Sequence, residues 1–306
     1  MDINIVHLPR PNCRARVIAL HCSGAGASQW RHLGSALGGG YELLAPEHFG
    51  CESAGPWTGA HAFTLADEAA KTIALIDECE EKLHLVGHSY GGGVALNAAV
   101  ARPDKIAGMV LYEPSAFHLL RLMGSTGASA YAEIANVAQR TSHGVLTGDY
   151  RGAVAGFVDY WNGAGTWDAM RPVLQDGLMR WCPKAPLDFR ALMEEATPPD
   201  AYRSLAFPVL VLQGEHAPTP TRMISRFLGD LLANCQLIVV GGAGHMGPLT
   251  HAPEVSGLIV RHLVETRAHV GSTAVASVAA NRHALGALPR TPSQIGDPTS
   301  LAAAEL

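Results

Sequence analysis

The stretch LHLVGHSYGGGV, residues 83–94, joins a short apolar run to a glycine-rich continuation through a single serine. Its centre, GHSYG, matches the pattern G-x-S-x-G, in which a strand turns sharply into a helix and leaves the serine strained at the tip. We expect Gly87 and Gly91 to be required because a side chain at either position would collide with the turn. The stretch predicts a candidate nucleophile at Ser89, the alternative being an ordinary Gly-Ser turn.

Short β-rich runs alternate with helical patterns on both sides of this stretch. Such alternation predicts an α/β fold with a doubly wound, mostly parallel sheet covered on both faces by helices. One expected helix covers residues 64–79, where Thr64 and either Asp67 or Glu68 would cap the N-terminus. The expected strands cover residues 16–20, 42–46, 83–87, 108–112, 208–214 and 236–240.

Residues 117–203 depart from this alternation and predict a helical cap insertion over the sheet. They contain helix-like segments and no clear strand, and they carry the aromatic residues Tyr150, Phe157, Tyr160, Trp161, Trp167 and Trp181. The core is therefore expected in two parts, residues 1–116 and 204–267. Residues 268–306 are rich in Ala, Ser, Thr and Pro and are expected to form a low-complexity C-terminal tail.

The composition predicts a globular protein that binds neither nucleic acid nor membranes. Hydrophobic residues make up 48% of the 306 residues and charged residues only 16%, which favours a large buried core. The net charge is −5 and there is no basic run to attract a phosphate backbone or an anionic membrane surface. A small molecule is the expected partner, and the oligomeric state stays open.

The six cysteines are widely scattered and show no metal-ligand spacing with the histidines. We therefore expect free thiols in a reducing compartment and no metal site. The first 21 residues lack the basic head, apolar stretch and cleavage site of a signal peptide. The longest apolar runs are too short to span a bilayer. These features predict a cytoplasmic location.

Four motifs together resemble those of the α/β-hydrolase family, over roughly residues 15–265. They stand in the family's order and at plausible spacings, which makes the set more specific than any one motif. They are HCSGAGASQW (21–30), APEHFGCESAGPW (45–57), GHSYGG (87–92) and GAGHMGPLTHAPEV (242–255). The resemblance implies that Ser89 is the nucleophile of a Ser-His-acid catalytic triad.

A serine hydroxyl is a poor nucleophile at neutral pH and needs a base within hydrogen-bond reach. His245 follows an expected strand on a Gly-rich loop, where the family carries its catalytic histidine. Three other histidines have simpler explanations. His251 is expected to cap a helix or lie on the surface, His88 to face the core, and His21 to support the oxyanion loop.

Acyl transfer also needs N–H donors arranged around the developing oxyanion. The resemblance assigns one donor to the backbone of Tyr90, which opens the helix after the nucleophile. The second should come from HCSG, with the N–H of Ser23 preferred over that of Cys22. Most relatives have glycine at Cys22, so this side chain is either a small packing residue or a reactive thiol.

The acid of the triad is not at its usual place. Many relatives carry aspartate three residues after the glycine that ends the strand at 208–214, and this chain has Ala217 there. Glu113 lies at the end of the strand after the nucleophile helix, a location that supplies the acid in some relatives, including several haloalkane dehalogenases. We expect Glu113 to be the acid and Glu215 the alternative. Otherwise Glu113 is a capping or salt-bridged acid at a strand end.

A serine nucleophile argues for acyl-enzyme chemistry, without a metal or organic cofactor, on a small apolar or aromatic carboxylic ester. The aromatic residues of the insertion would line its pocket or simply pack together. Because HCSGAGAS is similar to the HGSGPGAS loop of carbon-carbon bond hydrolases of ring-fission products, such an activity is an alternative, although Ala25 replaces the proline. A cofactor-independent dioxygenase is another. The missing aspartate at Ala217 also leaves open a non-catalytic binding module.

Overall fold

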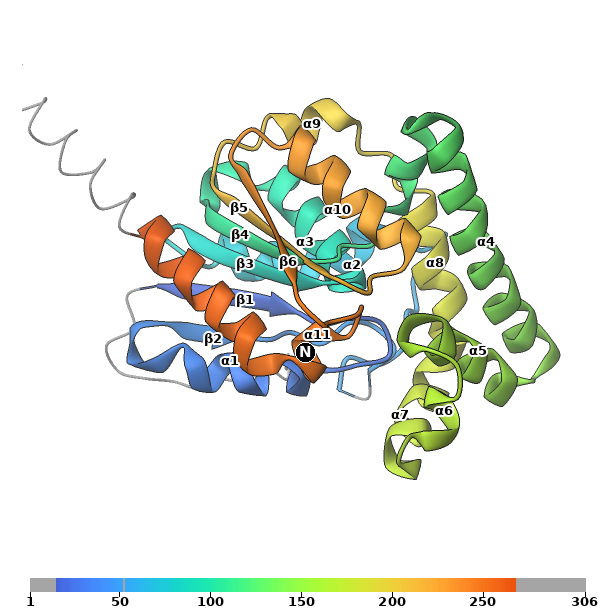
Figure 1. Cartoon of the computed structure of the whole chain (residues 1–306). Coiled ribbons are helices and arrows are strands. Elements are labelled where there is room, and N and C mark those ends of the chain that lie inside the picture. The colour runs from blue at the N-terminus through green and yellow to red at the C-terminus, as the bar shows by residue number, and fades with distance from the viewer. Residues whose placement is uncertain (1–14, 52, 268–306) are drawn as a thin grey trace, which may run out of the picture. The chain divides into compact units, whose positions relative to one another are not determined.

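The structure is a computed structural model that describes residues 15–51 and 53–267. The tail expected at residues 268–306 lies outside the described residues. Six strands form one sheet in the order β2-β1-β3-β4-β5-β6, and all neighbours are parallel (Figure 1). The strands are β1 (Arg16–Leu20), β2 (Glu42–Leu44), β3 (Leu83–His88), β4 (Ile106–Tyr112), β5 (Val209–Gly214) and β6 (Cys235–Val240). The predicted α/β class with a parallel sheet is confirmed.

Helices cover both faces of this sheet and give two hydrophobic cores. Successive side chains of a strand point to opposite faces, so Ile18 and Leu20 enter one core and Val17 and Ala19 the other. Both faces being buried explains why the strands read as continuous apolar runs. The first core contains side chains of α2 (Leu65–Asp77), α3 (Tyr90–Ala101) and α10 (Thr219–Leu231). The second contains side chains of α1 (Arg31–Ala36) and of a helix at 252–267.

The N-terminus of α2 shows how the sequence sets a local boundary. The Thr64 hydroxyl accepts a hydrogen bond from the Asp67 N–H, and the Asp67 carboxylate accepts one from the Thr64 N–H at 2.8 Å. This reciprocal capping box satisfies two N–H groups that the helix leaves free. Asp67 therefore caps the helix, which leaves the neighbouring Glu68 to point into the interior, where its side chain is fully buried.

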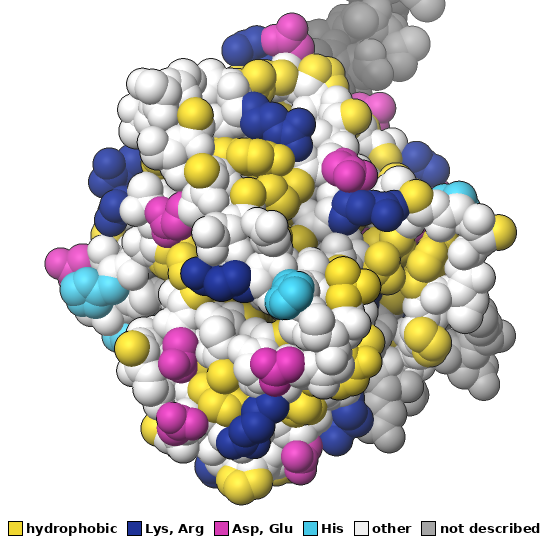
Figure 2. Space-filling model, turned by 90° about the vertical axis from the view of Figure 1, so that its right-hand side faces the viewer, with side chains coloured by type: hydrophobic (Ala, Val, Ile, Leu, Met, Phe, Trp, Pro, Cys, Tyr) yellow, Lys and Arg dark blue, Asp and Glu magenta, His cyan; other side chains and the backbone are white. Residues whose placement is uncertain are grey.

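The chain between β4 and β5 contains helices and no strand, all of its residues being described. All but the last of these helices lie together beside one end of the sheet (Figure 1). Basic, acidic and hydrophobic side chains are interspersed over their outer face (Figure 2). We refer to residues 117–203 as the helical insertion. Its α-helices are α4 (Gly124–Thr147), α5 (Tyr150–Asn162), α6 (Thr166–Ala169), α7 (Pro172–Trp181), α8 (Ala185–Met193) and α9 (Pro199–Arg203).

Two further predictions concern the described residues. All five cysteines among them, Cys22, Cys51, Cys79, Cys182 and Cys235, are free. Cys13 lies outside the described residues. None of the helices within 15–51 and 53–267 has the length and apolar character needed to cross a membrane.

Candidate active site

Ser89 occupies the turn between β3 and α3 with backbone angles φ 53° and ψ −116°. This region is sparsely populated by residues other than glycine, and it aims the side chain out of the turn. A Cβ atom on Gly87 would lie 2.6 Å from the carbonyl oxygen of Gly91, and one on Gly91 would overlap the carbonyl oxygen of Leu20. The predicted need for glycine on both sides of Ser89 is confirmed.

The structure brings Ser89, His245 and Glu113 together, although they come from three different loops. His245 lies between β6 and the short helix α11 (Gly247–Thr250). Its Nε2 is 2.9 Å from the Ser89 Oγ, and its Nδ1 is 2.7 Å from Oε2 of Glu113. All three side chains are buried, with residue exposures of 6%, 2% and 0% for Ser89, His245 and Glu113. The geometry is that of a hydroxyl, a base and an orienting acid.

Glu113 directly follows β4 and has a positive φ of 42°. Its Oε1 accepts a hydrogen bond from the Gly214 N–H at 2.9 Å, and its Oε2 accepts one from the Thr221 hydroxyl at 2.8 Å. These donors and His245 together fix both carboxylate oxygens. Thr221 comes from α10, and sequence reasoning did not single it out. The contact with His245 argues against the simpler interpretation of Glu113 as a capping acid.

The structure does not bring Glu215, the alternative acid, to the histidine. Glu215 is exposed, and its Oε2 accepts a hydrogen bond from the Gly242 N–H at 2.8 Å. Ala217, at the position of the usual aspartate, is buried and holds no acid. Within the described part of the chain, Glu113 is the acid that contacts His245.

The remaining histidines take other places. His88 is buried, and its Nε2 donates a hydrogen bond to the backbone carbonyl of His245 at 2.9 Å. His21 is also buried, with its Nδ1 donating to the Cys22 carbonyl and its Nε2 accepting from the backbone N–H of His48. Burial lowers the pKa of His21 and His88 well below the ordinary value, so both are neutral supports at pH 7. His251 lies at a helix start beside Thr250.

The candidate oxyanion donors differ in availability. The N–H of Tyr90 opens α3 directly after the nucleophile. The N–H of Cys22, however, donates to the side-chain oxygen of Gln29 at 3.1 Å, so it is already engaged. Of the two candidates in HCSG, the Ser23 N–H therefore stays the preferred one. The Ser23 hydroxyl donates a hydrogen bond to Asp188 at 2.9 Å. Sequence reasoning did not single out Gln29 or Asp188.

The Cys22 thiol is expected to be inert. Burial raises its pKa to about 12, so almost no thiolate forms at neutral pH. Cys22→Ala is expected to change the rate of ester hydrolysis by less than about threefold, since the variant removes no hydrogen bond to the three central side chains. Steady-state rates of ester hydrolysis, measured for the variant and for wild type, check this prediction. A loss of a hundredfold or more in correctly folded protein would instead give the thiol a direct role.

Two further side chains contact Ser89 and His245, and sequence reasoning placed neither of them there. The Ser115 hydroxyl is 3.1 Å from the Ser89 Oγ. The indole of Trp161, from α5, stacks on the His245 ring with ring centres 4.1 Å apart and 27° between the planes. Ser115 follows Glu113 by two residues, which is the only signal that the sequence offered. Trp161 was predicted only as one of several aromatic residues that line a pocket or pack together.

A small cavity opens on Ser89 beneath the helical insertion. Its volume is about 20 Å³, which is room for about one water molecule. Three of the six aromatic residues expected in the insertion line it, and they face polar groups from the ends of the strands. The lining consists of Ser23, Ser89, Ser115, Phe117, Phe157, Trp161, Trp181, Asp188, Phe189 and Leu192.

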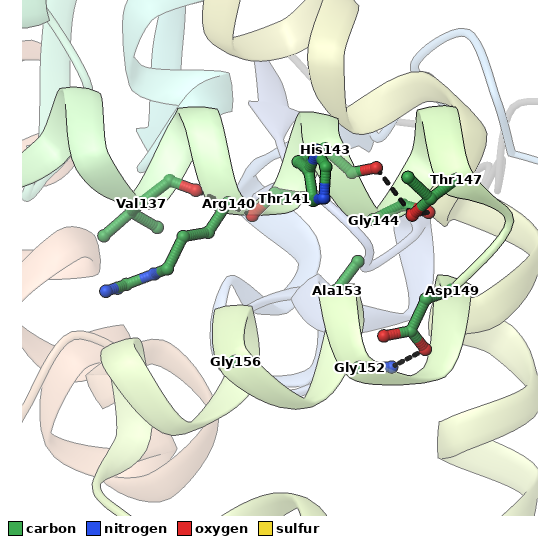
Figure 3. Close-up of a pocket in the computed structure, with 10 residues that line it drawn as sticks. All are labelled: Val137, Arg140, Thr141, His143, Gly144, Thr147, Asp149, Gly152, Ala153 and Gly156. Atoms are coloured by element: carbon green, nitrogen blue, oxygen red, sulfur yellow. Dashed lines mark hydrogen bonds between the residues drawn. The ribbon is translucent and has the colours of Figure 1, made fainter.

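A larger pocket of about 280 Å³ lies elsewhere, between α4 and α5 (Figure 3). Small residues, including Gly144, Gly152 and Ala153, form much of its wall, and Arg140 and His143 also line it. None of the site residues predicted from the sequence lines this pocket. The smaller cavity is therefore the candidate site.

A buried charged network joins the insertion to the core beside the cavity. The Lys184 ammonium contacts Oε2 of Glu68 at 2.6 Å and Oδ1 of Asp188 at 2.5 Å. The Tyr90 hydroxyl donates to the same Glu68 oxygen at 2.8 Å. Burial alone would raise the pKa of Glu68, but His48 and Lys184 hold it well below its ordinary value. The network therefore contains an ionised Glu68.

Glu68→Gln is expected to destabilise the protein in a pH-dependent way. Because the folded-state pKa of Glu68 lies below the ordinary 4.5, its stabilising effect is complete above pH 4.5 and is lost as the pH falls further. The loss of unfolding free energy on substitution should therefore be largest near pH 7 and shrink towards pH 3. Urea unfolding of both proteins between these values checks this. An equal loss at every pH would contradict an ionised, paired Glu68.

No group of three or more His, Cys, Asp or Glu side chains in residues 15–51 and 53–267 is arranged to hold a metal ion.

The chain belongs to the alpha/beta hydrolase family, whose model matches residues 17–257. The curated relatives that match first do so over part of their length. The Cis-3-alkyl-4-alkyloxetan-2-one decarboxylase of Shewanella oneidensis is 30% identical over 106 residues, 34% of this chain and 33% of that protein. Lipase LipV of Mycobacterium tuberculosis is 33% identical over 113 residues, 36% of this chain and 42% of that protein. The aligned parts thus span less than half of these relatives.

One relative aligns over most of both chains. The 2-hydroxymuconate semialdehyde hydrolase of Pseudomonas sp. is 24% identical over 280 residues, 82% of this chain and 88% of that protein. Among solved structures, the enol-lactonase from Burkholderia xenovorans superposes with a TM-score of 0.68 at 16% identity, covering 86% of this chain and 98% of that one. At this identity the structural match establishes the fold.

Proposed function

We propose that the protein is a serine hydrolase that cleaves a small apolar or aromatic carboxylic ester through an acyl-enzyme. The observation that carries this proposal is the buried chain of contacts from the Ser89 hydroxyl through His245 to Glu113, opening on an aromatic cavity. A hydroxyl, a base and an orienting acid at these distances are what nucleophilic acyl transfer requires.

In the first half-reaction, the Ser89 Oγ attacks the ester carbonyl carbon while His245 Nε2 takes the hydroxyl proton. Glu113 holds the proton on Nδ1 and stabilises the imidazolium that forms. The carbonyl oxygen becomes an oxyanion that accepts hydrogen bonds from the N–H groups of Tyr90 and Ser23. When the tetrahedral intermediate collapses, the alkoxide leaves and takes the proton from His245.

In the second half-reaction, water attacks the acyl-enzyme and gives its proton to His245 Nε2. Collapse releases the carboxylic acid and returns the proton to the Ser89 Oγ. The indole stacked on His245 covers one face of the imidazole, and it would keep bulk water from that face while the acyl group is bound. In this proposal the helical insertion acts as a cap, because its aromatic residues close the cavity over the nucleophile.

A carbon-carbon bond hydrolase is the second candidate. It is favoured by the 2-hydroxymuconate semialdehyde hydrolase that aligns over most of the chain. None of the relatives reported above favours the dioxygenase alternative. The binding-module alternative predicted that the histidine would lack an acid, whereas Glu113 lies 2.7 Å from it.

Labelling with a fluorophosphonate probe, together with turnover of short p-nitrophenyl esters and of 2-hydroxymuconate semialdehyde, tests the proposal. We expect rapid labelling and faster turnover of the esters. Faster turnover of the semialdehyde would favour the second candidate. Folded wild-type protein that is not labelled and cleaves neither substrate would overturn the hydrolase proposal.

A further inference from the structure

Asp188 places a carboxylate in the wall of the cavity that holds Ser89. It lies on α8, its side chain is only 4% exposed, and it lines the cavity directly. Its Oδ2 accepts hydrogen bonds from the Ser23 hydroxyl at 2.9 Å and from the Trp181 indole N–H at 3.1 Å. Asp188 therefore sits at the polar end of a cavity whose remaining wall is mostly aromatic.

The cation paired with this carboxylate does not line the cavity. The Lys184 ammonium is shared between Asp188 and Glu68. His48 also contacts Glu68, at 3.5 Å, but neither His48 nor Lys184 lines the cavity. None of the lining residues is Lys or Arg. The charged group that a substrate meets beside Ser89 is thus Asp188.

We propose that Asp188 is a specificity-determining residue that selects uncharged acyl groups and excludes acyl groups that carry a carboxylate. This inference rests on the proposed ester hydrolysis and narrows its substrate class. In a buried site the repulsion between like charges is screened weakly, and the carboxylate of a substrate would also lose its hydration. A neutral acyl group of the same shape incurs neither cost. A ring-fission dienoate also carries a carboxylate, so its binding in this cavity would be disfavoured for the same reason.

This inference can be tested with two p-nitrophenyl esters of similar shape, the neutral 4-carbamoylbenzoate and the anionic 4-carboxybenzoate. For wild type we expect kcat/KM of the neutral ester to exceed that of the anionic ester by about thirtyfold or more. Asp188→Asn removes the charge and retains an oxygen acceptor, so it should reduce this ratio about tenfold. Asp200→Asn, an exposed site outside the cavity, should leave the ratio unchanged. A wild-type ratio near one, which needs no variant, would overturn the inference.

A binding measurement separates this inference from the proposed function. Calorimetric titration of Ser89→Ala protein with benzamide and benzoate reports charge preference without turnover. Tighter binding of benzamide than of benzoate, with a smaller difference in affinity when Asp188→Asn is added to Ser89→Ala, would support the charge filter. This result would hold even if neither ester were hydrolysed, and only the proposed function would then fail. Fast hydrolysis of both esters with equal binding of both ligands would support the hydrolase and reject the charge filter.

Discussion

Ser89→Ala is expected to abolish fluorophosphonate labelling and to lower kcat for p-nitrophenyl esters by roughly 10⁵- to 10⁶-fold. The Ser89 Oγ is 2.9 Å from the base and sits at the tip of a turn that exposes it to the cavity. Without this oxygen no acyl-enzyme forms, and only oxyanion stabilisation of direct water attack is left. Gel fluorescence after probe treatment and initial rates measure the two effects.

Ser129→Ala is the matched control because it removes the same hydroxyl from an exposed position on α4. It should be labelled and should turn over like wild type. Circular dichroism of both variants verifies the fold. Labelling of Ser89→Ala at the wild-type rate would assign the nucleophile to another residue, for which the neighbouring Ser115 is the first candidate.

Glu113→Gln is expected to lower kcat by about 10³- to 10⁴-fold with a much smaller change in KM. The amide oxygen can still accept from the Gly214 N–H, and the NH₂ group can donate to the Thr221 hydroxyl oxygen. It cannot stabilise the imidazolium, and its NH₂ group can favour the wrong tautomer of His245. The rate loss should therefore appear in acyl transfer rather than in substrate binding. Steady-state kinetics and the rate of probe labelling measure it.

Glu215→Gln provides the control for this acid. Glu215 is exposed and bonded to Gly242, so its substitution should change kcat by no more than about twofold. A large loss of kcat in Glu215→Gln, together with an active Glu113→Gln, would instead assign the acid to Glu215, one residue beyond Gly214. Equal, small losses in both would mean that His245 works without an acid.

The strands and the nucleophile turn could be predicted because their signals are local. Short apolar runs between helical patterns mark the strands, and only glycine fits the backbone around Ser89. Glu113 could be predicted as the acid by topology, since the carboxyl ends of neighbouring parallel strands lie side by side. Its partner Thr221 could not, because it lies 108 residues further along the chain and is brought in by the packing of α10.

The residues that line the site could not be predicted, because tertiary packing rather than a local sequence pattern brings them together. Asp188 and Lys184 are four residues apart, as in many exposed helix pairs, and nothing in that spacing says that the pair is buried against Glu68. Trp161 is one aromatic residue among several, and only the packing of α5 within the helical insertion decides that it covers His245. Gln29 lies in a short 3-10 helix, Ala27–Trp30, and accepts a hydrogen bond from the Cys22 N–H, a contact that no periodicity indicates.

A cavity of about 20 Å³ admits a solvent molecule but no ester. In the proposed reaction, the wall of this cavity must therefore move to admit an ester and to release the products. Ser89 is only 6% exposed beside Trp161 and its aromatic neighbours. The residence time of the product, rather than bond cleavage, can then set the pace of the cycle.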